Sequence, residues 1–206
     1  MRADPKIVEL DFGMGNIRSL QKAFEFLGKN VSVIQRPDSI AQADALLIPG
    51  DGAFGQAMEN IKQAGFYEAI MDFVKTGKPV LGICIGFQIL FHSSEEFDYT
   101  GTGLDIFPGR IEKFTSRDLI IPHMGWNKVA WEKPTRLNKD IPQESYFYFV
   151  HSYRYGKIHE YATGTAQYDG RFTAVIEKDN VYGVQFHPEK SYRMGLQLLK
   201  NFTGLF

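Results

Sequence analysis

The 206-residue sequence contains one cysteine, Cys84, and therefore cannot form an internal disulfide. No apolar run approaches the roughly 18 residues that span a membrane, and the amino terminus lacks the long apolar core of a signal peptide. The formal net charge is only −1, from 23 basic and 24 acidic residues, so no broad field attracts nucleic acid or an anionic membrane. We expect a soluble, cytoplasmic protein that binds neither.

The pattern of apolar segments predicts an α/β fold. Short apolar runs alternate with amphipathic stretches in the first half, which indicates parallel strands joined by helices. We expect strands at 7–12, 31–35, 45–49 and 79–84, and helices at about 16–27 and 65–75. After about Gly101 the pattern is typical of strands and hairpins, and residues 191–202 have helical spacing.

The length favours one domain over two. We therefore predict a single domain over residues 1–206, in which helices flank a mostly parallel central sheet and further antiparallel strands come from the second half.

Cys84 follows an apolar strand and lies between two glycines in PVLGICIGFQIL. Gly82 and Gly86 allow the strand and the next helix to approach closely, as a nucleophile elbow requires. A helix amino terminus at this point stabilises the reactive thiolate. The alternative is that Cys84 is a small core hydrophobe, as most free cysteines are.

A histidine and a carboxylate follow another apolar strand in VYGVQFHPEKS. Pro188 fixes the backbone between His187 and Glu189, so that the imidazole and the carboxylate can face each other. The histidine would take the thiol proton, and the carboxylate would orient the ring. A single histidine at a strand end is more often structural, but the fold can bring His187 and Cys84 to one sheet edge, where such sites form.

The glycine-rich loop in LLIPGDGAFG, residues 46–55, is the third component. Acyl transfer builds negative charge on the carbonyl oxygen, and backbone N–H groups can stabilise it. We predict an oxyanion hole from Gly52 in this loop and from Ile85, which follows the nucleophile. An ordinary strand-to-helix turn would have the same composition.

The other polar residues predict no metal site and no cofactor. The remaining histidines have no metal-ligand spacing, so hydrogen-bonded or surface positions account for them: they are His92, His123, His151 and His159. The segment GMGN after the first strand lacks the G-x-G-x-x-G pattern of a dinucleotide-binding loop.

The segments PGDG, GICIGFQ and HPE, in this order, resemble the class I, or triad, glutamine amidotransferases. Within that family, nearly the whole chain from Ile7 to Phe202 is similar to the glutaminase subunits of imidazole glycerol phosphate synthase. The segments that carry this resemblance are DFGMGNIRS, IPGDGAFGQAM, FHSSEEF, PHMGWN, YFVHSYRY and GVQFHPEKS. PHMGWN separates these subunits from their relatives.

The resemblance implies a flavodoxin-like fold and a triad of Cys84, His187 and Glu189 that forms a γ-glutamyl thioester. It also implies that L-glutamine is held by the residues Gln88, Glu96, Gly52, Ser152 and Tyr153. Gln88 lies four residues after Cys84 and so shares its helix face. Glu96 is suited to the substrate's α-amino group, although a solvated side chain is the alternative.

The resemblance further implies a partner, a cyclase subunit with a (β/α)8-barrel fold. That subunit receives the ammonia and makes imidazole glycerol phosphate and aminoimidazole carboxamide ribonucleotide in histidine biosynthesis. Asn16, Met124 and Trp126 are candidates for the docking face of this heterodimer. Trp126 lies next to Gly125 in a turn-like context, and tryptophan is a favoured interface anchor.

Asp51 departs from the family pattern, because these subunits usually carry a small apolar residue there. An acid in the oxyanion loop would repel the oxyanion if it pointed inward and would do nothing if it pointed to solvent. We expect it to point to solvent. The competing hypothesis is that Asp51 holds the loop unproductive until the partner docks.

Three other functions remain open. A stand-alone cysteine peptidase or γ-glutamyl hydrolase of similar architecture would release its product to water and would need no docking segment. A paralogous glutaminase that feeds a different synthase, in sugar or vitamin modification, would keep nearly every motif. A non-catalytic binding module on the same fold would lose a triad residue, and this chain has lost none.

Overall fold

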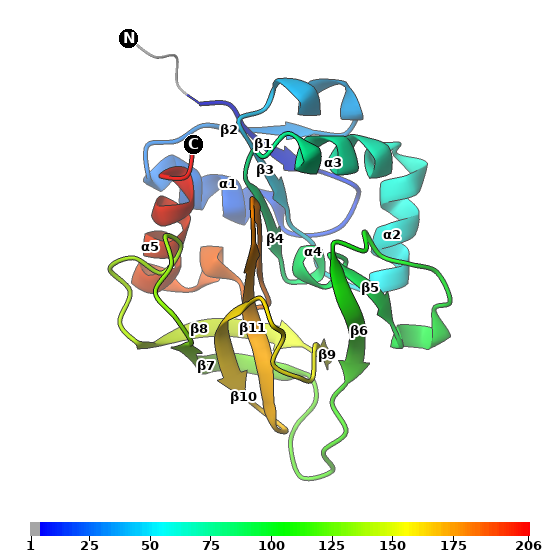
Figure 1. Cartoon of the computed structure of the whole chain (residues 1–206), viewed down its shortest axis with the longest axis vertical. Coiled ribbons are helices and arrows are strands. Elements are labelled where there is room, and N and C mark those ends of the chain that lie inside the picture. Colours follow the sequence, from blue (N-terminus) through cyan, green and yellow to red (C-terminus); the bar gives the residue numbers. More distant parts are fainter. Residues whose placement is uncertain (1–4) are drawn as a thin grey trace.

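The computed structural model describes residues 5–206. The expectation about the amino terminus falls partly on residues 1–4, which lie outside the described residues. Within residues 5–206, nine strands form one central sheet (Figure 1). In spatial order they are β2 (Val31–Ile34), β1 (Ile7–Leu10), β3 (Ala45–Ile48), β4 (Val80–Ile83), β12 (Val181–Val184), β11 (Arg171–Lys178), β10 (Ala162–Gln167), β7 (His123–Trp131) and β8 (Glu144–His151). The first five pair in parallel, and every pair from β12 to β8 is antiparallel. The predicted fold class is confirmed.

The remaining elements surround this sheet. Among the described residues, a second sheet pairs β5 (Phe91–Ser94), β6 (Phe107–Lys113) and β9 (Tyr153–Arg154). The α-helices are α1 (Ile17–Phe26), α2 (Phe54–Gln63), α3 (Phe66–Lys75), α4 (Ile85–Gln88) and α5 (Tyr192–Thr203). Short 3-10 helices are η1 (Pro37–Gln42), η2 (Glu96–Asp98) and η3 (Pro188–Lys190). Across residues 5–206, none of the helices has the length and hydropathy needed to pass through a bilayer.

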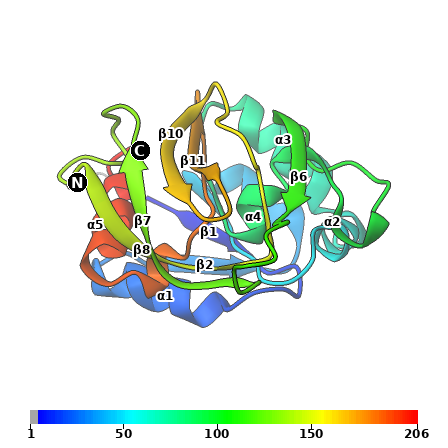
Figure 2. The ribbon, with the colours of Figure 1, turned by 90° about the horizontal axis from the view of Figure 1, so that it is seen from below.

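Helices cover both faces of the parallel strands, which explains why these strands are so apolar. Helices α1 and α5 pack on one face, and α2 and α3 pack on the other (Figures 1 and 2). In α1, Leu20, Ala23 and Phe24 are buried at helical spacing. The side chain of Asn16 caps this helix by accepting a hydrogen bond from the backbone N–H of Ser19 (3.3 Å).

Three neighbouring parallel strands carry the three motifs to one edge of the sheet. Strands β3, β4 and β12 lie side by side, and their carboxyl ends point the same way. The loop at Gly52 follows β3, Cys84 follows β4, and His187 follows β12. This is the edge at which sites form in open α/β sheets, as the sequence predicts.

Two parts of the fold differ from the sequence prediction. Helix α2 was not expected, because Gly55 and Ala57 weaken the apolar stripe on its sequence. Trp126 lies within strand β7, in register with Tyr148 of β8, and not in a turn. Gly125 suggested a turn, and it does have a positive φ of 130°, but the strand continues through it.

Candidate active site

Cys84 occupies a sharp, strained turn between β4 and α4. Its φ of 55° and ψ of −105° are unusual for a residue with a side chain. Its backbone N–H donates to the carbonyl oxygen of Val184 (2.9 Å), which ties the turn to β12. The residue is only 5% exposed, yet its side chain lines a cleft.

The glycines beside Cys84 are required by close backbone contacts. A Cβ at Gly86 would overlap the carbonyl oxygen of Ile48, and a Cβ at Gly82 would press on the backbone of Gly86. The predicted close approach of strand and helix is confirmed. The helix itself is a single turn, Ile85–Gln88, so few aligned peptide dipoles act on the sulfur, fewer than the sequence suggested.

His187 and Glu189 face each other across Pro188. The Nδ1–H of His187 donates to Oε1 of Glu189 (2.8 Å), which leaves Nε2 on the side of the cysteine. The backbone N–H of His187 donates to Tyr148 (2.9 Å), and the Ser191 hydroxyl donates to the His187 carbonyl (2.6 Å). These contacts with β8 and with the start of α5 fix the ring in place.

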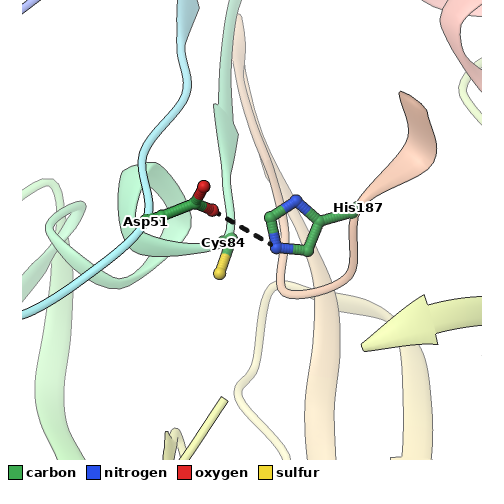
Figure 3. Close-up of side chains that lie close together, drawn as sticks. All are labelled: Asp51, Cys84 and His187. Atoms are coloured by element: carbon green, nitrogen blue, oxygen red, sulfur yellow. Dashed lines mark ion pairs between the residues drawn. The ribbon is translucent and has the colours of Figure 1, made fainter. Parts of the chain in front are cut away.

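The imidazole lies beside the sulfur and beside an unexpected carboxylate. Cys84 Sγ, a ring nitrogen of His187 and a carboxylate oxygen of Asp51 all lie within 4.8 Å of one another (Figure 3). Burial lowers the pKa of His187, but its interactions with Cys84 and Glu189 outweigh burial and raise the pKa from 6.5 to about 10. The environment therefore favours the imidazolium form of His187 beside the sulfur of Cys84.

A cleft of about 740 Å³ opens over Cys84. It is large enough to admit an amino acid. Every residue predicted to hold glutamine lines it: Gly52, Gln88, Glu96, Ser152 and Tyr153. These five residues, which the resemblance implied, come from four separate segments of the chain and meet at this cleft.

Glu96 and Gln88 are buried, not solvated. Oε2 of Glu96 accepts a hydrogen bond from the backbone N–H of Phe54 (2.7 Å), and burial raises the pKa of its carboxyl, although this hydrogen bond opposes the rise. Nε2 of Gln88 donates to the carbonyl of Tyr153 (2.9 Å) and to Oε1 of Gln185 (3.0 Å). Gln88 thus fixes the backbone of the cleft wall around Tyr153.

One of the two predicted oxyanion donors is already engaged. The N–H of Ile85 donates to the carbonyl of Gly50 (3.3 Å) in the glycine-rich loop. Gly52 has a φ of 101°, a conformation that favours glycine. The Gly50 carbonyl must turn away before the Ile85 N–H can face a substrate oxygen.

Asp51 points inward, so the expectation that it faces solvent is wrong. Its Oδ1 lies 3.7 Å from Nε2 of His187, and its side chain is 45% exposed.

The three predicted docking residues fall into two groups. Met124 and Trp126 are 62% and 46% exposed, and the Trp126 ring stacks on Tyr192 with centroids 5.4 Å apart. Asn16 caps α1 and lines a small cavity that also contacts His187 and Glu189. It therefore lies beside His187 and Glu189, apart from Met124 and Trp126.

The sequence did not single out His151, which lines the cleft. Its Nδ1–H donates to the carbonyl of Tyr153 (2.7 Å), and its Nε2 accepts from Nδ1–H of His123 (2.8 Å). Burial lowers the pKa of His151 to about 3, so it stays neutral and supports the cleft wall. In the sequence, only its place within an alternating strand pattern could have pointed to a role in the cleft. That pattern fits a structural histidine equally well.

Comparisons with known proteins agree with this geometry. The family described as glutamine amidotransferase class-I matches residues 8–204. A relative from Moorella thermoacetica, named imidazole glycerol phosphate synthase subunit HisH, is 45% identical over 97% of this chain and 94% of its own length. The protein of the same name from Chlorobaculum tepidum is 46% identical over 94% of this chain and 96% of its own length.

Solved structures agree at the level of the fold. A structure titled PurLQS from Thermotoga maritima has a TM-score of 0.78 with 19% identity, and the match covers 98% of this chain and 99% of that one. A structure titled glutamine amidotransferase has a TM-score of 0.75 with 16% identity and covers 97% of this chain and 98% of that one.

Proposed function

Because the chain belongs to the HisH family of class I glutamine amidotransferases, we propose that it hydrolyses L-glutamine as the glutaminase subunit of an imidazole glycerol phosphate synthase. The observation that carries this proposal is that Cys84 lies at the base of a cleft, within 4.8 Å of an imidazole that Glu189 orients. We also propose that residues 1–206 form one domain and that the protein is cytoplasmic.

The chemistry begins with the thiolate of Cys84 and the imidazolium of His187. The sulfur attacks the side-chain carbonyl of glutamine, and the new C–S bond places negative charge on the carbonyl oxygen. When this tetrahedral species collapses, the C–N bond breaks, and His187 gives its proton to the leaving nitrogen. Ammonia leaves, and a γ-glutamyl thioester remains on Cys84.

Water completes the cycle. His187, now neutral, accepts a proton from water as the oxygen attacks the thioester carbonyl. Glutamate leaves and the thiolate is restored. Glu189 keeps the ring in the tautomer with its free nitrogen toward the sulfur and stabilises the positive charge of the imidazolium.

The oxyanion would be held by backbone N–H groups of Gly52 and Ile85. Since the Ile85 N–H is paired with Gly50, hydrolysis requires the loop to rearrange. A slow basal rate and activation by a partner follow from this requirement.

Glutamine would be oriented by the cleft wall. The carboxylate of Glu96 would accept the substrate's α-ammonium group. Backbone groups at Gly52, Ser152 and Tyr153 would hold its other polar atoms. The role of Gln88 is to fix the Tyr153 backbone through its hydrogen bond.

The partner proposed for this chain is a cyclase subunit of (β/α)8-barrel fold. It would receive ammonia and make imidazole glycerol phosphate and aminoimidazole carboxamide ribonucleotide in histidine biosynthesis. Its docking face on this chain includes Met124 and Trp126, which are exposed beside the mouth of the cleft, and Asn16 near the triad.

Replacing Trp126 with alanine is expected to weaken binding of the cyclase subunit. A central interface tryptophan contributes roughly 2 kcal/mol or more, about thirtyfold in Kd. Titration calorimetry with the purified cyclase subunit measures this. Phe26→Ala is the matched control, because Phe26 is 77% exposed but lies at the far end of α1 from Asn16. An equal loss in both variants, or none in Trp126→Ala, would contradict the docking face.

The proposed function is tested by mixing the chain with the cyclase subunit and its nucleotide substrate. Glutamine should then yield glutamate and imidazole glycerol phosphate in equal amounts. Glutamate without that product, or product only with a different acceptor, would favour a paralogous glutaminase for sugar or vitamin modification. No glutamate under any condition would favour a non-catalytic binding module.

A further inference from the structure

Three different metal-binding groups lie close together, on the side chains of Asp51, Cys84 and His187. A thiol sulfur, a ring nitrogen and a carboxylate oxygen all lie within 4.8 Å of one another (Figure 3). In a tetrahedral zinc site, ligand atoms lie roughly 3.3–3.6 Å apart, as bond lengths of about 2.0–2.3 Å require. The Asp51 Oδ1 to His187 Nε2 distance, 3.7 Å, is already near that value.

His187 is prepared as a metal ligand. Its Nε2 is buried and has no hydrogen-bond partner among the described residues, and the side chain is 3% exposed. Its other nitrogen donates to Glu189 (2.8 Å). Ligating histidines usually donate their second ring N–H to a carboxylate in this way, which orients the ring so that Nε2 can bind the metal once the metal displaces its proton.

The donor set selects the metal. One thiolate, one imidazole and one carboxylate suit Zn²⁺, whereas Mg²⁺ and Ca²⁺ prefer oxygen ligands alone. The cleft lined by Asp51 and Cys84 opens to solvent on the remaining side, so water can take a fourth position. The half-exposed Asp51 also gives a cation a path into the site.

We propose that Asp51, Cys84 and His187 form a Zn²⁺ site that blocks the glutaminase reversibly. Binding displaces the one proton that Cys84 Sγ and His187 Nε2 hold between them, and both atoms then bond the metal. The sulfur can no longer attack glutamine, and the imidazole can no longer carry a proton. The inhibitory effect, but not the metal binding, rests on the proposed function of Cys84.

Zinc binding by the metal-free full chain tests this inference. Titration calorimetry, with a chromophoric chelator as competitor, gives stoichiometry and affinity. One Zn²⁺ per chain is expected, and Asp51→Asn should weaken binding at least about tenfold, since even outer-shell partners of zinc ligands contribute 10–100-fold. Co²⁺ used in place of Zn²⁺ should show a thiolate-to-cobalt absorption band that Cys84→Ala removes.

Asp105→Asn is the matched control. Asp105 also pairs with a histidine, His92 (3.0 Å), and it is similarly exposed, but the sequence provides no other cysteine for that pair. Its replacement should leave zinc affinity unchanged. Circular dichroism of each variant establishes that it is folded.

The inference is overturned if Asp51→Asn binds Zn²⁺ as tightly as the parent chain, or if the Co²⁺ complex has no thiolate band. Glutamine hydrolysis is measured in parallel, with the cyclase subunit present and a chelator in the buffer. Hydrolysis without zinc binding would refute only the metal site. Zinc binding through Cys84 without any hydrolysis would refute only the proposed function.

Discussion

Replacing Cys84 with alanine is expected to reduce glutamine hydrolysis by roughly ten-thousandfold or more. The variant has no thiol at all, since Cys84 is the only cysteine, so no neighbouring sulfur can substitute. Without the nucleophile the thioester cannot form, and the remaining groups only orient glutamine and water. Release of glutamate by the complex with the cyclase subunit measures the effect.

The fold and partner binding of the Cys84→Ala variant should be intact. Alanine removes one atom and leaves the turn between β4 and α4 with its Cβ. Added ammonia should therefore restore synthesis of imidazole glycerol phosphate by the complex. Residual hydrolysis near the parent rate would show that the nucleophile lies elsewhere.

Replacing Glu9 with glutamine is expected to remove a large pH dependence of stability. Glu9 lies on β1 and is 0% exposed, and neither of its carboxyl oxygens has a hydrogen-bond partner within residues 5–206. Burial, together with the nearby negative charges of Glu189 and Asp11, raises its pKa from 4.5 to about 8. The folded protein therefore holds a proton at this carboxyl that the unfolded chain releases.

Folding takes up a proton at Glu9, and this uptake sets the direction in which stability changes with pH. Between pH 4.5 and 8 the folded state binds more protons than the unfolded state, so the free energy of unfolding falls as pH rises. The loss by pH 8 is roughly 3–5 kcal/mol relative to pH 4.5. The neutral amide of Glu9→Gln has no such titration, so its stability relative to the parent should rise over this range.

Urea unfolding of both proteins at several pH values measures this difference. Glu25→Gln is a suitable control, because Glu25 is an exposed glutamate on α1. It should follow the parent chain at every pH. Parallel curves for Glu9→Gln and the parent would show that the buried carboxyl stays ionised or finds a partner.

The sequence predicts the position of the triad because the constraints there are local. Gly82 and Gly86 are dictated by backbone contacts around the turn, and Pro188 sets the path between His187 and Glu189. Parallel strands then bring both segments to the same edge, whatever the side chains do. Fold class and site location are therefore available from pattern alone.

Side-chain directions and long-range contacts cannot be predicted from such local sequence patterns. Asp51 could face solvent or the imidazole, and only the position of His187 decides between them. Whether the Ile85 N–H is free depends on the direction of the Gly50 carbonyl, to which it donates a hydrogen bond. Rotation of a single peptide group would change that direction. His151 supports the cleft only because β7 and β8 bring it beside His123.

Mass spectrometry of the chain, quenched in acid while it turns over glutamine with its partner, tests the central claim most directly. If the thiolate of Cys84 is the nucleophile, one γ-glutamyl group should be found on the peptide that contains Cys84. The same peptide should carry none when His187 is replaced by alanine. Steady production of glutamate with the group on another residue would contradict the account.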